Sequence, residues 1–333
     1  MAEIVTLTVA EVIEETADAR SIVFEVPDEF TYSPGQFLTL RIPSDRTGSV
    51  ARCYSLSSAP HEGRVQVTVK RTADGYGSNW VCDELKEGVT IETLRPSGTF
   101  TPSSLDKDFL LFAAGSGITP VMSILKAALE KGHGRIVLVY ANRDEQSVIF
   151  ARELRELACD RLTVVHWLES LQGLPATKAL QGFTKPYPGY EAFICGPAPF
   201  MTAAQEALRE LGFPHQKVHV EKFHSLTGNP FEDKPEPEDS GGETTTLTVD
   251  LDGETRQVTW PRQRKLLDHL LAEGFDAPYS CREGQCSACA CRIVSGEVKM
   301  LNNEVLDAED IAEGIVLACQ SVPLTDDVSV TYE

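Results

Sequence analysis

Four cysteines near the C-terminus have the type and the spacing that a metal centre requires. Cys281, Cys286 and Cys289 follow the pattern C-x4-C-x2-C, and Cys319 follows after a long intervening stretch. A [2Fe–2S] cluster needs four thiolates that converge on two irons, and this is one of the spacings that hold it. A tight loop would present three sulfurs while a distant segment completes the site. The pattern therefore predicts a protein that carries single electrons, which the rest of the chain must supply.

Zinc binding and disulfide bonds are the two other uses of cysteine that the sequence allows. A structural zinc site also favours four thiolates, but its ligands usually come as two C-x2-C pairs, and the sequence contains one such pair. Disulfides are disfavoured because the total of nine cysteines is odd and because no signal peptide precedes them. Cys291, two residues beyond Cys289, is expected to be a packed small side chain and not a ligand.

The composition limits the class of protein. A chain of 333 residues suggests two or three domains. No run approaches the ~18 consecutive apolar residues that cross a bilayer, so we expect no membrane span and a cytoplasmic location, where thiols stay reduced. A net charge of −20 argues against nucleic acid as a partner, because its phosphates would be repelled. The acidity suits either docking onto a basic patch of a protein partner or simple solubility.

Three changes of sequence pattern divide the chain into domains. Residues 1–105 contain short alternating strands separated by turn residues, which is typical of an antiparallel β-barrel. In residues 106–229, short apolar strands alternate with amphipathic helices, which predicts a parallel α/β sheet covered on both faces. Residues 230–244 are rich in acidic residues, proline and glycine, and are expected to form a semi-extended linker. Residues 245–333, with a hairpin, a helix and the cysteine loop, are expected to form a small β-grasp domain.

Two turns in the middle domain have the composition of a nucleotide site. Gly115 and Gly117 lie between a strand and a helix, where glycine lets the backbone approach a pyrophosphate held by helix N-terminal amides. Pro120 replaces the third glycine of the G-x-G-x-x-G pattern, so an ordinary Rossmann dehydrogenase is disfavoured and a tight structural turn is an alternative. Cys195 and Gly196 end the last buried strand before a helix. Both turns lie at the carboxyl edge of the predicted parallel sheet, where ligands bind.

A third motif lies in the first domain. Residues 52–58, RCYSLSS, alternate a guanidinium, a phenol and hydroxyls along a strand. Because alternate residues of a strand face the same side, Arg52, Tyr54 and Leu56 would project together, and arginine and tyrosine suit a phosphate and a flavin ring. A half-buried strand would explain the same pattern. Residues 75–78, GYGS, open a helix and create a further anion site.

Taken in order, these motifs resemble the ferredoxin–NADP reductase superfamily, in the branch that carries a C-terminal ferredoxin domain. The match consists of R-x-Y-S-L, G-S-G-I-T-P, C-G-P and C-x4-C-x2-C…C, and it covers essentially the whole chain. The resemblance implies an FAD-binding barrel, an NAD-binding α/β domain and a plant-type [2Fe–2S] ferredoxin domain. More narrowly, residues 70–76, 165–170 and 279–284 resemble the reductases that serve 3-ketosteroid 9α-hydroxylases in actinobacteria.

The resemblance also implies roles for particular residues. Arg52 would contact the flavin phosphates, Tyr54 the ribityl chain and ring, and Ser55 the ring edge near N5. Cys195 would lie beside the nicotinamide, with a buried strand cysteine as the alternative, so Ser55 and Cys195 are the candidate catalytic residues. Phe223 would lie near the flavin or else close the core. The other implied cofactor contacts are Leu56, Val69, Lys70, Gly77, Ser78, Gly115, Gly117, Thr119 and Gly196.

The implied function is an NADH-dependent oxidoreductase that passes electrons from NADH to FAD, then to the cluster, and then to a Rieske-type oxygenase in steroid and cholesterol catabolism. A flavin is needed because a hydride carries two electrons and a cluster accepts one. FMN and NADPH are alternatives; Arg143 could meet a 2′-phosphate, which Asp144 and Glu145 would repel. The other candidate functions are a reductase for a phenylacetyl-CoA epoxidase or another aromatic ring-hydroxylating oxygenase, a ferredoxin-type carrier without enzyme activity, and a zinc-containing flavin reductase.

Overall fold

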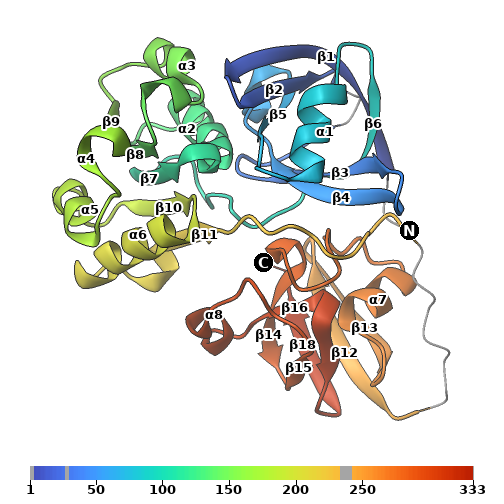
Figure 1. The fold of residues 1–333 in the computed structure, drawn as a ribbon. Helices are drawn as coiled ribbons and strands as arrows, with labels where there is room; N and C mark the ends of the chain where they lie inside the picture. The colour runs from blue at the N-terminus through green and yellow to red at the C-terminus, as the bar shows by residue number, and fades with distance from the viewer. Residues whose placement is uncertain (1–3, 27–29, 233–241, 333) are drawn as a thin grey trace.

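The computed structural model describes residues 4–26, 30–232 and 242–332 of the chain. These residues form three lobes that follow one another along the chain, each built around its own sheet (Figure 1). The linker predicted at 230–244 lies mostly outside the described residues. Within the described part, no helix is long and apolar enough to cross a membrane.

An antiparallel barrel forms the first lobe. Its strands follow the order β4-β3-β6-β1-β2-β5, and a bridge between Leu56 and Val67 joins the end of β4 to β5. Leu38, Leu40 and Ile42 alternate along one strand and are fully buried in the interior, as period-two patterning requires. The elements are β1 (Ile4–Thr16), β2 (Ala19–Phe24), β3 (Phe37–Ser44), β4 (Gly48–Ser55), β5 (Val65–Lys70), α1 (Tyr76–Glu84) and β6 (Thr90–Leu94).

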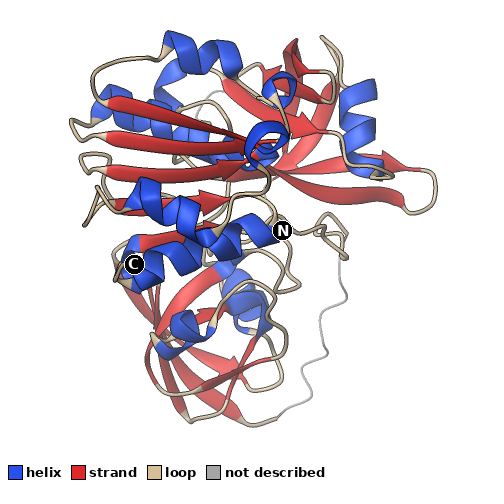
Figure 2. Ribbon diagram, turned by 60° about the vertical axis from the view of Figure 1, so that its left-hand side comes forward, coloured by secondary structure: helices blue, strands red, loops and turns tan. Residues whose placement is uncertain are grey.

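A parallel sheet in the order β11-β10-β7-β8-β9 forms the second lobe. Alternate residues of its central strand β7 enter two separate cores: Leu111 packs with helix α2, and Leu110 packs with helix α6. Figure 2 shows helices on both faces of this sheet. The strand β9 is only partly buried because it lies at the edge. The elements are β7 (Phe109–Ala114), α2 (Ile118–Lys131), β8 (Ile136–Asn142), α3 (Ala151–Glu156), β9 (Leu162–Leu168), α4 (Glu169–Gln172), α5 (Thr177–Thr184), β10 (Glu191–Cys195), α6 (Ala198–Glu210) and β11 (Val218–Glu221).

A mixed sheet in the order β13-β12-β18-β14-β16 forms the third lobe. The hairpin predicted around Asp252 and Gly253 is present, and both residues have the positive φ that this tight turn requires. Trp260 is fully buried in the core beneath helix α7. The elements are β12 (Thr244–Leu251), β13 (Glu254–Pro261), α7 (Leu266–Ala272), β14 (Ala290–Ser295), β15 (Val298–Met300), α8 (Ala308–Ala312), β16 (Ile315–Leu317), β17 (Ser321–Pro323) and β18 (Asp327–Thr331).

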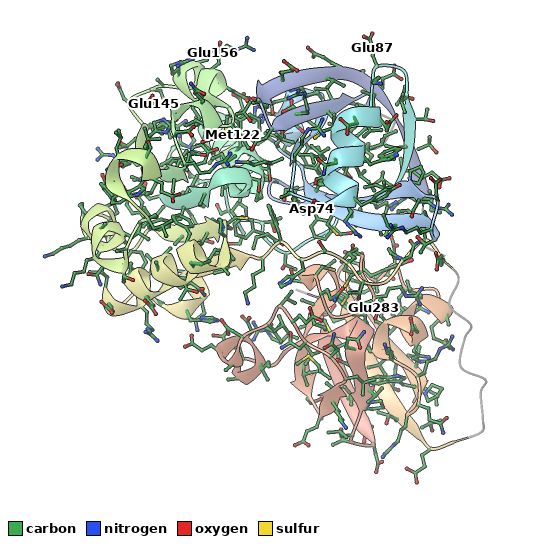
Figure 3. All side chains as sticks on the ribbon, viewed as in Figure 1. Asp74, Glu87, Met122, Glu145, Glu156 and Glu283 are labelled. Carbon is green, nitrogen blue, oxygen red and sulfur yellow. The ribbon has the colours of Figure 1, made fainter. Side chains whose placement is uncertain are left out.

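The third lobe packs against the barrel through its cysteine loop. Phe37 and Ala51 of the barrel form one apolar cluster with Cys281 and Cys286 of the loop. The segment that follows β11 runs between the two lobes, and its Leu226 joins the same cluster. Figure 3 places Glu283, another residue of the loop, on the side of the third lobe that faces the barrel. The cysteine loop is therefore an interface element as well as the predicted metal-binding segment.

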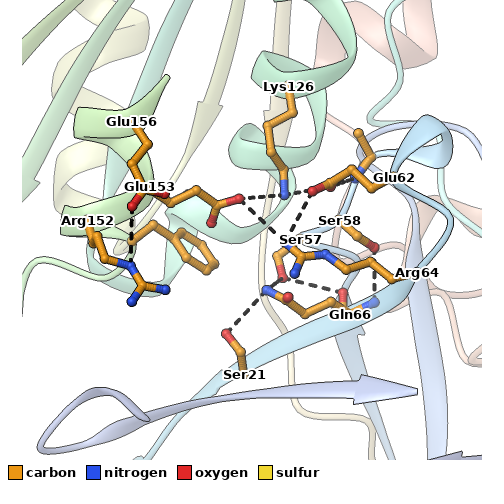
Figure 4. Close-up of polar contacts among 12 residues, drawn as sticks. Ser21, Ser57, Ser58, Glu62, Arg64, Gln66, Lys126, Arg152, Glu153 and Glu156 are labelled. Carbon is orange, nitrogen blue, oxygen red and sulfur yellow. Dashed lines mark hydrogen bonds and ion pairs between the residues drawn. The ribbon is translucent and has the colours of Figure 1, made fainter. Parts of the chain in front are cut away.

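A buried lysine joins the barrel to the second lobe (Figure 4). The ammonium of Lys126, on α2, lies 2.7 Å from Oε2 of Glu62 in the barrel and 3.1 Å from Oε1 of Glu153 on α3. Burial alone would raise the pKa of Glu62, but the Lys126 charge holds that pKa below its ordinary value. Removal of one member of such a buried set leaves an uncompensated charge. The set therefore fixes how the two lobes that carry the flavin and nucleotide motifs sit against each other.

Candidate functional site

The four cysteines predicted to bind iron lie close together in the third lobe. Three come from the loop before β14, and Cys319 comes from the turn between β16 and β17. Each has at most 8% of its surface exposed. The backbone N–H of Cys281 donates to Sγ of Cys286 at 3.4 Å, and that of Cys319 donates to Sγ of Cys289 at 3.5 Å. Two N–H groups thus point at two of the four sulfurs, and the four buried thiols lie close enough together to suit one cluster.

Backbone donors converge on the first of these sulfurs. The N–H groups of Glu283 and Gln285 donate to Sγ of Cys281 at 3.4 and 3.3 Å. The thiols of Cys286 and Cys319 also donate to Cys281, and these hydrogen bonds lower the pKa of Cys281. The same thiol–thiol bonds raise the pKa of the two donors. These donors therefore favour the thiolate at Cys281, the form in which cysteine binds iron.

Cys291 lies outside this group. It belongs to β14, pairs across the sheet with Val316, and is 3% exposed within the core of the third lobe. Burial raises the pKa of its thiol, so the side chain stays protonated. Its place is that of a small packed side chain, as the sequence predicts.

The arginine of the barrel motif lies against the start of helix α1. A Cβ on Gly77 would lie 2.7 Å from Cγ of Arg52, so the absence of a side chain at Gly77 lets the arginine stem reach the first helical turn. The guanidinium donates to the carbonyls of Ala51 at 2.7 Å and Leu226 at 3.3 Å. A fixed guanidinium beside unpaired helix N-terminal amides is a favourable site for phosphate.

The other predicted barrel residues either pack in the core or stabilise the start of helix α1. Leu56 and Val69 are almost fully buried in the barrel interior, so their side chains stabilise the fold. Tyr54 packs against the same core, and burial raises the pKa of its phenol, which stays neutral. The hydroxyl of Ser78 accepts a hydrogen bond from the Thr72 N–H at 3.0 Å, which stabilises the start of α1.

The nucleotide turns come together at the carboxyl edge of the parallel sheet. A Cβ on Gly117 would lie 2.1 Å from the carbonyl oxygen of Cys195, so glycine is required for the two turns to touch. Gly115 has a φ of +53°, which also favours glycine. The hydroxyl of Thr119 donates to the carbonyl of Ser116 at 3.0 Å. Cys195 is fully buried, and burial raises the pKa of its thiol well above the ordinary value.

A cavity of about 500 Å³ lies beside these turns. Gly115 and Gly196 line it from the second lobe, Lys70 from the barrel, and Phe223 and His224 from the segment after β11. Phe223 is 50% exposed, so it is not a core residue. A cavity of this size with a few converging polar groups is typical of a cofactor site.

A small cavity of about 30 Å³ connects the same residues to the cysteine loop. It is lined by Ser55 of the barrel, by Phe223 and His224 of the segment after β11 (the crossing segment), and by Cys286 of the loop. Phe223 and His224 therefore line both cavities. This segment therefore lies between the nucleotide turns and the cysteine loop, and it lines the cavity at each of them.

Comparison with known proteins assigns each lobe to a family. Residues 6–101 match the oxidoreductase FAD-binding domain, residues 111–206 the oxidoreductase NAD-binding domain, and residues 249–324 the 2Fe-2S iron-sulfur cluster binding domain. The ferredoxin reductase component of 3-ketosteroid-9-alpha-monooxygenase from Rhodococcus rhodochrous is 58% identical, over 98% of this chain and 97% of the relative. A subunit of 1,2-phenylacetyl-CoA epoxidase from Escherichia coli (strain K12) is 34% identical, over 98% and 97% of the two chains. The solved structure of phthalate dioxygenase reductase matches with a TM-score of 0.56 and 26% identity over 98% of both chains.

The chain belongs to this family of three-domain reductases. It is an NAD-dependent oxidoreductase, and its cofactors are FAD and a [2Fe–2S] cluster. The predicted antiparallel flavin barrel, parallel nucleotide-binding domain and C-terminal ferredoxin domain are confirmed. FAD in place of FMN is likewise confirmed by the family match of the barrel.

The residues of the reductase fit these cofactors. The four buried cysteines suit a two-iron cluster, and the glycines at 77 and 117 leave room where a side chain would clash. The buried Nε2 of His224 has no hydrogen-bond partner among the described residues, although it lines both cavities. A buried polar atom without a partner costs free energy, so this nitrogen is suited to a bound group.

Sequence analysis missed two residues of this region. It gave no role to any histidine, yet His224 faces the cofactor cavities. It also passed over Glu221, which pairs with Cys195 across β10 and β11 and lines the small cavity. Burial raises the pKa of Glu221 to about 8. The signal for both was their adjacency to Phe223, since the end of a parallel strand is where ligand contacts concentrate.

Proposed function

We propose that the reductase supplies electrons from NADH to the oxygenase component of a 3-ketosteroid 9α-monooxygenase, and that this partner is a Rieske-type oxygenase. The observation that carries the proposal is the 58% identity to the ferredoxin reductase component of that system over nearly the full length of both chains. The identity to the phenylacetyl-CoA epoxidase relative is 34% over a similar length. A plant-type cluster has a reduction potential of about −400 mV, which is low enough to reduce a Rieske centre.

The arrangement of residues supports a linear order of cofactors. The turns at Gly115 and Gly196 would hold the nicotinamide nucleotide, and Arg52 with the first turn of α1 would hold the flavin phosphates. When bound, FAD accepts a hydride from NADH and releases its electrons singly. Phe223 lines the cavity beside the nucleotide turns and the cavity beside Cys286. It would therefore cover the flavin ring between the point where electrons enter and the point where they leave.

The region after β8 favours NADH over NADPH. Arg143 is the one residue there that would attract a 2′-phosphate, and its guanidinium is 3.0 Å from Oδ2 of Asp18. The hydroxyl of Ser147 donates to Oδ1 of Asp144 at 2.9 Å, the Ser147 N–H donates to it at the same distance, and these hydrogen bonds lower the pKa of Asp144. A paired arginine beside an ionised carboxylate is a poor site for an additional phosphate. We therefore expect a much lower KM for NADH than for NADPH.

Reconstitution with purified oxygenases tests the proposal. The loaded reductase is mixed with NADH and the oxygenase component of the Rhodococcus steroid system, and 9α-hydroxylated steroid is measured against NADH consumed. A parallel reaction uses the oxygenase component of the Escherichia coli phenylacetyl-CoA epoxidase. We expect tight coupling of NADH use to product with the steroid oxygenase. Efficient coupling only with the epoxidase would overturn the steroid assignment, and a purified protein without a flavin spectrum would overturn the enzyme assignment altogether.

A further inference from the structure

Strand β4 of the barrel has two differently placed faces. Alternate residues face the proposed flavin site, and the residues between them face the cluster loop. Val50 and Tyr54 of β4 pack with the barrel core, and Arg52 lies against Gly77 of α1. Ala51 and Cys53 point the other way and join the apolar cluster that contains Cys281 and Cys286. The period-two geometry of a strand thus connects the flavin motif directly to the iron-binding loop.

A buried hydroxyl pair lies at the centre of this contact. Oγ1 of Thr39, on β3, is 2.7 Å from Oγ of Ser280, and each residue has 1% of its surface exposed. Sγ of Cys53 is 3.5 Å from the threonine hydroxyl and 3.8 Å from the serine hydroxyl. Ser280 is bonded to Cys281, the first cluster ligand in the sequence. Strands β3 and β4 of the barrel therefore contact the cluster loop directly, through the side chains of Thr39, Cys53 and Ser280.

Two further hydrogen bonds join the barrel to the ferredoxin domain. The hydroxyl of Ser97 donates to the carbonyl of Tyr279 at 3.2 Å, and that of Thr99 donates to Ser287 at 3.0 Å. The apolar cluster with Phe37 excludes water on another side. Apolar packing tolerates small sliding movements, whereas a buried hydroxyl pair is satisfied in only one placement, since a lost partner costs the full desolvation of the group left behind.

We propose that the hydrogen bond between Thr39 and Ser280, with Cys53 packed beside it, fixes the position of the ferredoxin domain in which electrons pass from the flavin to the cluster. Thr39 and Ser280 are positioning residues that act through this placement. In each transfer, reduced FAD loses one electron and the cluster gains one, with NADH as the ultimate reductant. The proposal rests on the electron path within this chain and is independent of which oxygenase follows.

Substitution of Thr39 separates this step from the hydride step. Thr39→Val keeps the shape of the side chain and removes the hydroxyl, and Thr39→Ser keeps the hydroxyl as the matched control. Each loaded variant is mixed rapidly with NADH without any oxygenase. Flavin reduction is followed by absorbance, and cluster reduction by freeze-quench electron paramagnetic resonance. We expect Thr39→Val to slow cluster reduction about tenfold with hydride transfer unchanged, and Thr39→Ser to restore the wild-type rate.

A double-mutant cycle with Ser280→Ala identifies the contact. If one of the two single variants does not fold, the other still tests the proposal by itself. If one hydrogen bond is at work, the double variant is no slower than the single variants. Flavin content, NADH-driven ferricyanide reduction and the resonance spectrum of the reduced cluster show whether each variant carries intact cofactors. Unchanged cluster reduction in Thr39→Val would overturn the proposal, as would effects of the two substitutions that simply add. Neither result would bear on the steroid assignment.

Discussion

The cluster site and the flavin–nicotinamide site are built by opposite means. The cluster site uses four identical side chains, all in one domain, and each thiolate would bond to iron directly. The other site combines one arginine, several glycines, a helix start and an exposed aromatic residue from two domains and a connecting segment. Its glycines contribute by leaving space for neighbouring atoms, and this role cannot be recognised from the chemistry of a side chain.

This difference determines how each site fails. Loss of one thiolate removes a bond that the remaining three cannot replace, so the cluster site should fail completely. The nucleotide site holds its ligands through many weaker contacts, so single substitutions there should give graded losses. The predictions below test this contrast, from the largest expected effect to the smallest.

Cys319→Ser should abolish electron delivery. The cluster would be lost or labile, so NADH-driven turnover of any oxygenase should fall to background while flavin-level reduction of ferricyanide persists. Iron and sulfide analysis with both assays measures this. Cys291→Ser is the matched control, because Cys291 is equally buried but packs in the core; its cluster should remain. Equal loss of both activities in Cys319→Ser would show that the two sites are not separable.

Arg52→Gln should weaken FAD binding about tenfold or more, because it removes a charged donor to phosphate. The protein should purify with little flavin, and titration with FAD should restore absorbance and ferricyanide activity. The cluster should be retained, which is the reverse of the Cys319→Ser result. Arg20→Gln serves as the control, since Arg20 belongs to the same barrel but pairs with Glu14 at 2.7 Å. Normal FAD content in Arg52→Gln would contradict the assignment of a phosphate contact.

The same contrast explains how much the sequence revealed. The four cysteines could be proposed as cluster ligands because that role depends on residue type and spacing alone. The apolar runs that form β7, β8 and β10 were also readable, since a strand buried on both faces has no polar positions. Arg52 and the nucleotide glycines could be proposed from local patterns, although the pattern did not reveal that Gly117 faces the carbonyl of Cys195.

Contacts between domains could not be predicted. Cys53 and Ser280 lie 227 positions apart in the sequence, and neither residue type signals an interface. Lys126 in an amphipathic helix would ordinarily be solvated, yet it is 4% exposed because two carboxylates from different domains surround it. His224 carries no motif, and its importance arises from a crossing segment whose path depends on how the three domains pack. Such positions follow from tertiary structure and not from local periodicity.

Gly117→Ala should destabilise the reductase by at least about 2 kcal/mol, because the added methyl group would overlap backbone atoms that cannot yield. The KM for NADH should also rise, since the two turns can no longer touch. Gly182→Ala is the control: Gly182 lies within α5 with open space around it, and alanine there should be neutral or slightly stabilising. Thermal unfolding at a fixed scan rate and steady-state kinetics measure both. Equal melting temperatures for the two variants would contradict the close approach.

Glu221→Gln should have the smallest effect of these variants at pH ~5, and its effect should grow as pH rises. Burial raises the pKa of Glu221 to about 8, whereas in the unfolded chain it returns to its ordinary value. The folded protein therefore binds this proton more tightly than the unfolded chain, and stability falls as pH rises between those two pKa values. The variant lacks this loss, so it should melt close to the wild type at pH ~5 and above it at pH ~8.5. A difference in melting temperature that stays constant with pH would mean that Glu221 is ionised in the folded reductase. Its charge would then be balanced by a nearby positive charge, as the charges of the four thiolates would be balanced by iron.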